Sequence, residues 1–326
     1  IQPSQERINF FTRGTLQINP TWQAYGELNL YRSESESHST PSGIHGSVGY
    51  PGGPVSNAAI ALGPTHPDNP YFGSTARMRY LAADVGPRVS NIESDFIRFV
   101  AGAKGEIAGW EIDTGLLFSQ NEVSNDRSGF LQRDVAFALL NPSGPNVAAA
   151  MANPGYAALP PGSFWRIAES AGLTSPALYA ALAPVISNDA KTRITQIDIK
   201  GTREYGQLAG GPIGVAVGGE FRREEATLEP TTGTERGVIV GLGYSAYDGS
   251  RNVAALYGEV LAPVHTTLEL SAALRADHYN DVGDSYTPKF GFKWSPLKTF
   301  AARGTYARGF RAPSTAENGV GGLAAF

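Results

Sequence analysis

Residues 252–314 read NVAALYGEVLAPVHTTLELSAALRADHYNDVGDSYTPKFGFKWSPLKTFAARGTYARGFRAPS and contain four segments in which apolar and polar residues alternate. Between 288 and 294, for example, Phe290, Phe292 and Trp294 alternate with Lys, Gly and Lys. Successive side chains of a β-strand point to opposite faces of a sheet, so this pattern predicts strands with one apolar and one polar face. Antiparallel strands of this kind build either a β-sandwich or a transmembrane β-barrel.

The composition narrows these alternatives. The chain has 326 residues, of which 41% are hydrophobic and 17% charged, and it contains no cysteine. Neither a disulfide nor a thiolate metal site is therefore possible. The net charge of −4 argues against a nucleic-acid surface. No run of 18 apolar residues occurs, which excludes a transmembrane helix. A transmembrane strand needs only ~10 residues and leaves no such run.

The alternation recurs along the whole chain and predicts an all-β fold of about ten long strands, connected as an antiparallel meander. Ahead of the opening stretch, the predicted strands are 7–18, 21–33, 77–104, 110–119, 192–205 and 213–225. We expect the third strand to bend near 86–87. Two short helices are expected inside a long connection, at 133–140 and 176–182.

The predicted connections alternate between short and long. Short turns fall at 19–20, 105–109, 207–212, 262–266 and 295–298, and long loops at 34–76, 120–190 and 226–251. Outer-membrane barrels combine short periplasmic turns with long extracellular loops in this way. Trp22, Trp110 and Trp294 each lie beside a short turn on the apolar face. Indole rings concentrate at the membrane–water interface, so the three favour an aromatic girdle over the core of a sandwich.

The polar faces of the predicted strands carry many charges. They include Glu27, Asp113, Asp198, Lys200, Glu220, Arg222, Glu259, Glu269, Arg275, Asp277, Lys289, Lys293 and Arg303. A sandwich or narrow barrel would bury these groups at a cost of several kcal/mol each, if unpaired. A wide, water-filled barrel interior leaves them solvated, so the sequence predicts a large transmembrane barrel.

Four motifs in this chain resemble barrel motifs of the TonB-dependent outer-membrane receptors. Three are VGGEFRRE at 217–224, YGEVLAP at 257–263 and ALRADHY at 273–279. The fourth, RGFRAPS, resembles the motif that occurs where a strand rises into an extracellular loop. Its residues are Arg308, Gly309, Phe310, Arg311, Ala312, Pro313 and Ser314. The four follow one another in the family's order over about a third of the chain.

The resemblance implies an importer in the outer membrane of a Gram-negative cell. Such a receptor has a barrel of about 22 strands, closed by an N-terminal plug through which the TonB system supplies energy. Residues 1–326 are then expected to form part of one barrel domain, without the plug and the remaining strands. The expected partners are outer-membrane lipid, a small-molecule nutrient and, through the plug, the TonB system. The nutrient would be a ferric siderophore or other metal chelate, cobalamin or an oligosaccharide.

Three other functions are alternatives to uptake. A passive, porin-like channel has the same alternation of strands and loops and stays open as the first alternative, and a structural or adhesive surface barrel is the second. An enzyme is not expected, because Gly162-Ser163-Phe164 lacks the flanking pattern of a nucleophile elbow. We expect no catalytic residue, no cofactor and no nucleic-acid partner.

Aromatic residues in the long loops are the candidates for nutrient binding, because exposed rings offer stacking surface. The best group is Phe164, Trp165 and Arg166, which follows a Pro-Pro break and places two rings beside a cation. Packing within the loop is an equally strong explanation for it. The other loop aromatics are Tyr50, Tyr71, Phe72 and Tyr156, of which Tyr71 and Tyr156 are preferred for binding.

One carboxylate–imidazole pattern is a possible metal site. Glu34, Glu36 and His38 alternate at the end of the second predicted strand, and His45 follows. Ligands at this spacing suit a divalent cation, but a hydrophilic extension of the strand explains them more simply. No metal site is therefore predicted.

Overall fold

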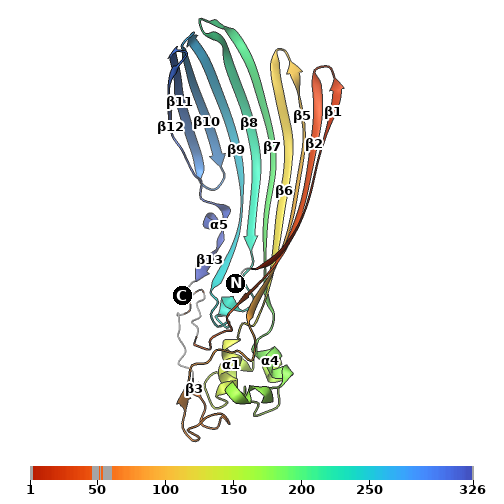
Figure 1. The fold of residues 1–326 in the computed structure, drawn as a ribbon, viewed down its shortest axis with the longest axis vertical. Coiled ribbons are helices and arrows are strands. Elements are labelled where there is room, and N and C mark those ends of the chain that lie inside the picture. Colours follow the sequence, from red (N-terminus) through yellow and green to blue (C-terminus); the bar gives the residue numbers. More distant parts are fainter. Residues whose placement is uncertain (1–2, 46–50, 52, 54–60, 325–326) are drawn as a thin grey trace.

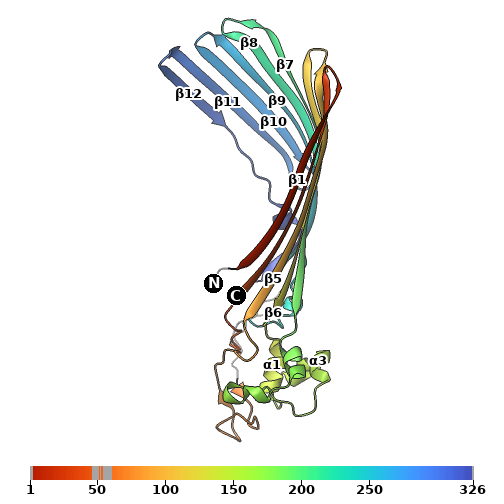
Figure 2. The same cartoon turned by 45° about the vertical axis from the view of Figure 1, so that its right-hand side comes forward.

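A computed structural model describes residues 3–45, 51, 53 and 61–324. In this part of the chain, ten long strands form one open antiparallel sheet in the order β1-β2-β5-β6-β7-β8-β9-β10-β11-β12. The strands are β1 Ser4–Asn19, β2 Trp22–Ser39, β5 Arg88–Ile107, β6 Trp110–Ser128, β7 Ile186–Leu208, β8 Gly211–Leu228, β9 Tyr244–His265, β10 Leu268–Tyr279, β11 Gly283–Leu297 and β12 Phe300–Ala307. Figures 1 and 2 show a tall, curved sheet with small helices beyond one end. The predicted all-β meander is thus confirmed.

The strand register separates two faces of the sheet. Leu270 of β10 lies opposite Phe292 of β11, and Phe292 lies opposite Gly304 of β12. The same register runs through the other strands and collects apolar side chains on one face, here called the outer face. Its exposed members include Leu30, Ile97, Phe99, Leu116, Ile197, Val217, Phe221, Leu256, Val260, Leu270, Leu274, Phe290 and Phe292. An uncovered apolar face of this size is unusual for a protein surrounded by water.

The connections alternate as predicted. Short turns join the strands at one end of the sheet, and the long loops gather at the other (Figure 1). Trp22 and Trp110 are the first residues of β2 and β6, and Trp294 lies near the end of β11. All three have the outer-face register, so their predicted placement beside the short turns is confirmed.

The third strand was predicted wrongly in its first part. β5 begins at Arg88, and the preceding residues 78–87 fold away from the sheet. The backbone N–H of Ile44 donates to the carbonyl of Tyr80, and that of Ala82 donates to Ser42. These loop contacts, rather than a strand bent near 86–87, satisfy the backbone of this segment.

Several strands extend further into the long-loop end than predicted. β6 continues to Ser128 and β7 begins at Ile186, so their loop covers 129–185 rather than 120–190. The added segment NEVSNDRS is polar on both faces, yet it pairs in register with β7. The apolar alternation is lost because both faces meet water there, whereas the backbone hydrogen bonds continue.

The long loops fold together into a compact unit, here called the cap. Helices α1 Arg133–Leu140 and α4 Pro176–Leu182 have the predicted bounds. Its shorter elements are β3 Ala61–Leu62, β4 Ala76–Arg77, α2 Val147–Ala150, α3 Pro154–Ala157, η1 Ala168–Leu173 and η2 Thr234–Arg236. One hydrophobic core joins residues of all three long loops: Ile44 and Leu62 of the first, Leu139, Trp165 and Leu182 of the second, and Val240 of the third. Among the described residues, no helix has the length and apolar character of a membrane span.

The chain beyond β12 turns back toward the middle of the sheet. A short helix, α5 Thr315–Asn318, is followed by β13 Val320–Ala324. β13 pairs with residues 244–248 of β9, which extend past the end of β10. Figure 1 shows this segment beside the lower half of β9.

Candidate functional site: the polar inner wall and the cap

The inner face of the sheet carries the charges that the sequence placed there. In β6 and β7, Asp113 lies opposite Lys200, and in β7 and β8, Asp198 lies opposite Glu220. The Tyr25 hydroxyl of β2 donates to Asp113 Oδ1 at 2.9 Å, although β5 lies between these strands. It crosses Gly102 of β5, where any side chain would collide with the Tyr25 ring. The predicted polar face is thus confirmed as one continuous wall.

Ion pairs run along this wall near its centre. Arg222 bonds to Glu220 and, at 2.6 Å, to Glu224. Arg275 of β10 bonds to Asp277 at 2.8 Å and reaches Glu220 of β8 at 3.4 Å. Each of these five charged side chains therefore has a partner, while the wall as a whole remains polar. Such a surface can face water or a polar ligand, but not lipid.

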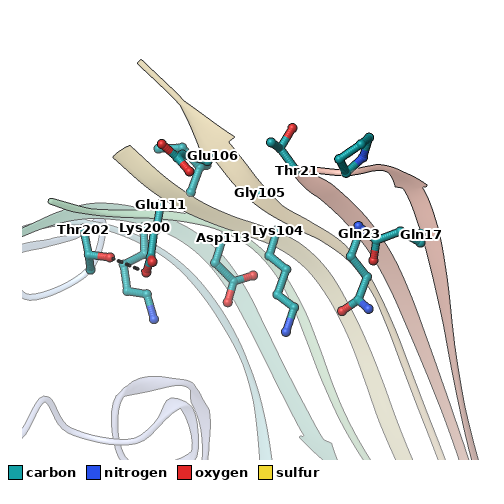
Figure 3. Close-up of a pocket in the computed structure, with 12 residues that line it drawn as sticks. Gln17, Thr21, Gln23, Lys104, Gly105, Glu106, Glu111, Asp113, Lys200 and Thr202 are labelled. Atoms are coloured by element: carbon teal, nitrogen blue, oxygen red, sulfur yellow. Dashed lines mark hydrogen bonds between the residues drawn. The ribbon is translucent and has the colours of Figure 1, made fainter. Parts of the chain in front are cut away.

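A recess lies on the inner wall near the short turns. It is lined by Gln17, Gln23, Lys104, Glu111, Asp113, Lys200 and Thr202, among others. Figure 3 shows Lys104, Asp113 and Lys200 projecting from the same face of the sheet. The cations and carboxylates alternate across three strands, which suits contact with a polar protein surface or with water.

The interior of the cap is organised around one carboxylate. Asp84 accepts hydrogen bonds from Trp165 Nε1 at 2.8 Å, from the Tyr179 hydroxyl at 2.7 Å and from the Tyr80 hydroxyl at 2.8 Å. Burial and the bond to Asp84 raise the pKa of Tyr179 to about 12, and they raise that of Tyr80 further. Because Asp84 and Trp165 come from different long loops, this carboxylate ties the two loops together.

A second cluster joins the same loops. Arg166 donates to Asp68 Oδ1 through Nε at 2.9 Å and Nη2 at 2.5 Å, and the Ile167 N–H donates to Asp68 Oδ2 at 2.9 Å. Burial opposes ionisation of Asp68, but these hydrogen bonds outweigh it and lower the pKa of the carboxyl to about 2.

His66 lies in the same cluster and is fully buried. The Asp68 N–H donates to Nδ1 at 3.1 Å, so Nε2 carries the proton and donates to the Trp165 carbonyl at 3.0 Å. Burial lowers the pKa of His66. The neutral ring is therefore a fixed part of the cap and receives the edge-to-face contact of Phe164 at 5.2 Å.

This geometry divides the predicted nutrient-binding residues into buried and exposed ones. Trp165 is 0% exposed, so the expectation of an exposed stacking ring is wrong at this position. The indole is buried because its N–H needs the Asp84 acceptor and its ring fills the core. Arg166 is held by Asp68, and Phe164 and Tyr156 are half-buried. Tyr71 is 68% exposed.

Phe72, the neighbour of Tyr71, provides a second exposed ring. Phe72 is 76% exposed and shares with Tyr71 a turn that is fixed from within. The buried Asn69 accepts from the Tyr71 N–H at 2.8 Å and donates to the carbonyls of Gly63 and Ser74. Tyr50 lies outside the described residues.

Sequence reasoning missed the polar residues that organise the cap. Asp84, Asp68 and His66 lie in coil, in no motif and with no period, and their partners in the second long loop are 81–99 residues away. The only signal is indirect: polar residues of these types, placed in a loop that contains a Trp and an Arg, need partners.

The possible metal ligands do not gather. His38 Nε2 lies 2.7 Å from Glu36 Oε1, whereas Glu34 accepts from Arg32. In the described parts of the chain, no group of three or more His, Cys, Asp or Glu side chains is arranged to hold a metal ion.

An open wall with an apolar outer face, a charged inner face and loops gathered at one end defines a piece of an outer-membrane type of β-barrel. A sequence model of the TonB-dependent receptor β-barrel matches residues 19–325. The chain belongs to this family. The motif at 308–314 accordingly begins where β12 ends and leads into the connection that holds α5.

Solved structures with a similar fold include siderophore receptors. One is a mutant of the ferric enterobactin receptor PfeA of Pseudomonas aeruginosa, with 12% identity and a TM-score of 0.52 over 96% of this chain. Another is the siderophore receptor PirA of Acinetobacter baumannii, with 11% identity and a TM-score of 0.47 over 96%. The chain spans 34% of the length of each. A search of curated protein sequences finds no match.

Proposed function

We propose that this chain is a wall segment of an outer-membrane receptor that takes up a scarce nutrient with energy from the TonB system. Its family supports this function, and the two faces of the wall suit it. Apolar side chains meet lipid on the outer face, while charges meet water on the inner face. The long-loop end, with the cap, then faces the cell exterior.

The observation that carries nutrient binding is the exposed pair Tyr71 and Phe72 on the cap. The two rings stand on a turn fixed by Asn69, so a ligand would lose little of its binding free energy to the ordering of the turn. Aromatic rings stack on planar chelating groups and on sugar rings alike. A ferric siderophore or other metal chelate is the preferred ligand, with cobalamin and oligosaccharides as further classes to be tested.

The other candidate binding residues have secondary roles in this proposal. Phe164 and Tyr156 keep part of their rings accessible, whereas the buried Trp165 positions the loop that carries Phe164 and Arg166. Arg166 already bonds to Asp68 and would reach a ligand oxygen only by sharing its donors. We therefore assign ring contact first to Tyr71 and Phe72.

Uptake by the full-length receptor tests the energy-coupled function. Cells carrying the receptor as their only added transporter should accumulate one of four probes: a ferric catecholate, a ferric hydroxamate, cobalamin or a maltooligosaccharide. Accumulation should disappear when TonB is deleted. Uptake that is equal with and without TonB would establish the passive, porin-like channel instead.

Binding by the same receptor tests the aromatic pair. Tyr71→Ala and Phe72→Ala should each weaken binding of the transported probe roughly two- to tenfold, the range expected for loss of one ring contact. Leu173→Ala, an exposed apolar position elsewhere on the cap, is the matched control. Unchanged affinity in both ring variants removes the pair from the site.

A further inference from the structure

The segment 308–324, here called the strap, folds back over the sheet instead of continuing away from it. Its first residue donates a backbone hydrogen bond to the Pro288 carbonyl of β11 at 3.0 Å. Its last five residues pair with β9. Between these two attachments the strap passes from the edge strands to the middle of the sheet (Figures 1 and 2).

The middle of the strap approaches β9 where neither chain has a side chain. A Cβ atom on Gly249 would lie 2.5 Å from the Thr315 carbonyl oxygen and 3.2 Å from Gly319. A Cβ atom on Gly319 would in turn lie 2.5 Å from the Asp248 carbonyl. Real Cβ atoms do not approach an oxygen to 2.5 Å, so α5 can occupy this position only because both residues are glycine.

Side chains hold the strap in this position. Asn318 Nδ2 donates to Asp281 Oδ2, in the turn between β10 and β11, at 3.0 Å. Arg311 donates to both oxygens of Glu317 at 2.9 and 3.0 Å, and Ser314 caps α5. These bonds give the strap a defined conformation. The Asn318 side chain attaches it to the turn at the rim of the inner wall.

Beneath the strap lies a guanidinium whose donors are incompletely used. Arg251 follows Gly249 by two residues on the inner face of β9, and its side chain is only 3% exposed. Its Nη2 is 2.9 Å from Asp281 Oδ2, which is an ion-pair distance, but neither Nη2 nor Nε directs its N–H at an acceptor. A buried donor without an acceptor is unfavourable, and a ligand oxygen would relieve it.

The other groups around Arg251 do not accept hydrogen bonds from its Nε and Nη2 donors. The ring of Tyr279 lies 5.7 Å from the guanidinium carbon, and Phe310 of the strap packs on the same ring at 5.9 Å. Glu224, which is opposite Arg251 in the register, is already bonded to Arg222. Asp281 Oδ2 accepts from Asn318 and also forms the ion pair with Arg251, so the strap and Arg251 share this one carboxylate oxygen.

We propose that Arg251 is an anion-binding residue of the inner wall and that the strap covers it until the strap leaves β9. The ligand would be an oxyanion, such as a carboxylate or phosphate group, bound by the charge-assisted donors of Arg251. That this anion belongs to the nutrient rests on the proposed function. The covering of Arg251 does not.

Arginine-specific labelling of the full-length receptor in membranes tests the cover. Phenylglyoxal labels accessible guanidinium groups, and peptide mass spectrometry reports Arg251 separately from the exposed Arg308. Arg251 should react at least about tenfold more slowly than Arg308, as expected for a group reached only by local opening. Equal rates in the unmodified receptor would overturn the proposal.

Two variants loosen the strap without touching Arg251. Gly249→Ala forces the strap away from β9, and Asn318→Ala removes its bond to Asp281. Arg251 labelling should accelerate about tenfold in the first and about fivefold in the second, the effect of one intramolecular hydrogen bond. Gly258→Ala is the control, because a Cβ atom there meets nothing closer than 3.8 Å. If neither variant accelerates labelling, the strap is not the cover.

The same assay tests anion binding with defined probes. In the Gly249→Ala receptor, citrate or inorganic phosphate should slow labelling of Arg251, by half when the probe concentration equals its Kd. Chloride at equal ionic strength should not slow it, and Arg308 should be unaffected. Failure of both citrate and phosphate overturns the anion site. Because no transport is measured, this result is independent of whether the receptor imports anything.

Discussion

The wall and the cap place the same kinds of side chain in opposite positions. Leu270 and Phe292 of the wall point outward and are 41% and 46% exposed, whereas Leu139 and Trp165 of the cap are fully buried. Burial of apolar area is favourable only relative to water. The wall needs no protein cover if lipid surrounds it, while the cap must build its own core. The surroundings, and not the residue types, decide which arrangement is stable.

Polar groups show the same contrast. On the wall, charges such as Asp113 and Lys200 line an open inner face. In the cap, the polar side chains Asp84 and His66 lie between two loops and are bonded to both. Removing a charge from the wall leaves its partners in contact with water, whereas removing one from the cap leaves donors buried without an acceptor.

The largest effect is expected from truncating a large side chain in the core of the cap. Trp165→Ala should destabilise the cap by about 3–5 kcal/mol, because it removes a fully buried indole. Hydrogen exchange in the full-length receptor should show faster exchange across 129–185 and unchanged exchange in β6 and β7. Phe72→Ala, an exposed ring of the same cap, should leave both rates unchanged. Equal exchange in all three proteins would show that the cap has no cooperative core.

The next effect concerns the outer face of the wall. Leu270→Arg or Phe292→Arg should cost ~2–4 kcal/mol near the bilayer midplane, because a charge would enter hydrocarbon. Ser271→Arg, one residue further along β10, points to the inner face and should cost much less. Folding into lipid vesicles measures all three. Similar penalties for positions 270 and 271 would contradict the division into two faces.

A smaller effect is expected at the carboxylate that joins the loops. Asp84→Ala should destabilise the cap by about 1–3 kcal/mol, because the buried Trp165 N–H and two Tyr hydroxyls lose their acceptor. Protease added to intact cells should then cleave the cap faster and spare the short turns. Asp189→Ala, at an exposed position of β7, is the control. No change in cleavage would show that the loops associate without Asp84.

The smallest effect is a pH dependence confined to the cap. Burial lowers the pKa of His66 below its ordinary value of 6.5, so the folded cap holds the neutral ring and the unfolded cap binds the proton more readily. Stability from this source is present above pH 6.5 and is lost as the pH falls below it. Asp68, with a pKa of about 2, adds a further loss only below its ordinary value of 3.8. Protection factors of the cap amides, which correct for the slower intrinsic exchange at lower pH, should fall between pH 7 and 5, and His66→Gln should abolish that fall.

The sequence predicted the wall far better than the cap for a physical reason. A strand with lipid on one side and water on the other must alternate, as 288–294 does, so its faces can be read residue by residue. Where water meets both faces, as at 121–128, the alternation ends although the strand continues, and the predicted boundary fell short.

The cap follows no such period, because its contacts join residues far apart in the chain. The α1 and α4 helices were predictable from local sequence. The burial of Trp165 was not, since it depends on Asp84, 81 residues away. An aromatic residue in a loop looks the same in sequence whether its ring is exposed or buried, so only the folded loops distinguish the exposed Tyr71 from the buried Trp165.

One measurement tests most directly the claim that the wall faces lipid on one side and the receptor interior on the other. Spin labels placed singly along β10 of the full-length receptor in membranes report collision with oxygen, which concentrates in lipid, and with a water-soluble nickel chelate. Oxygen accessibility should peak at Leu270, Ala272 and Leu274 and fall at Ser271, Ala273 and Arg275. Accessibility without this period of two, or with the opposite phase, would contradict the account.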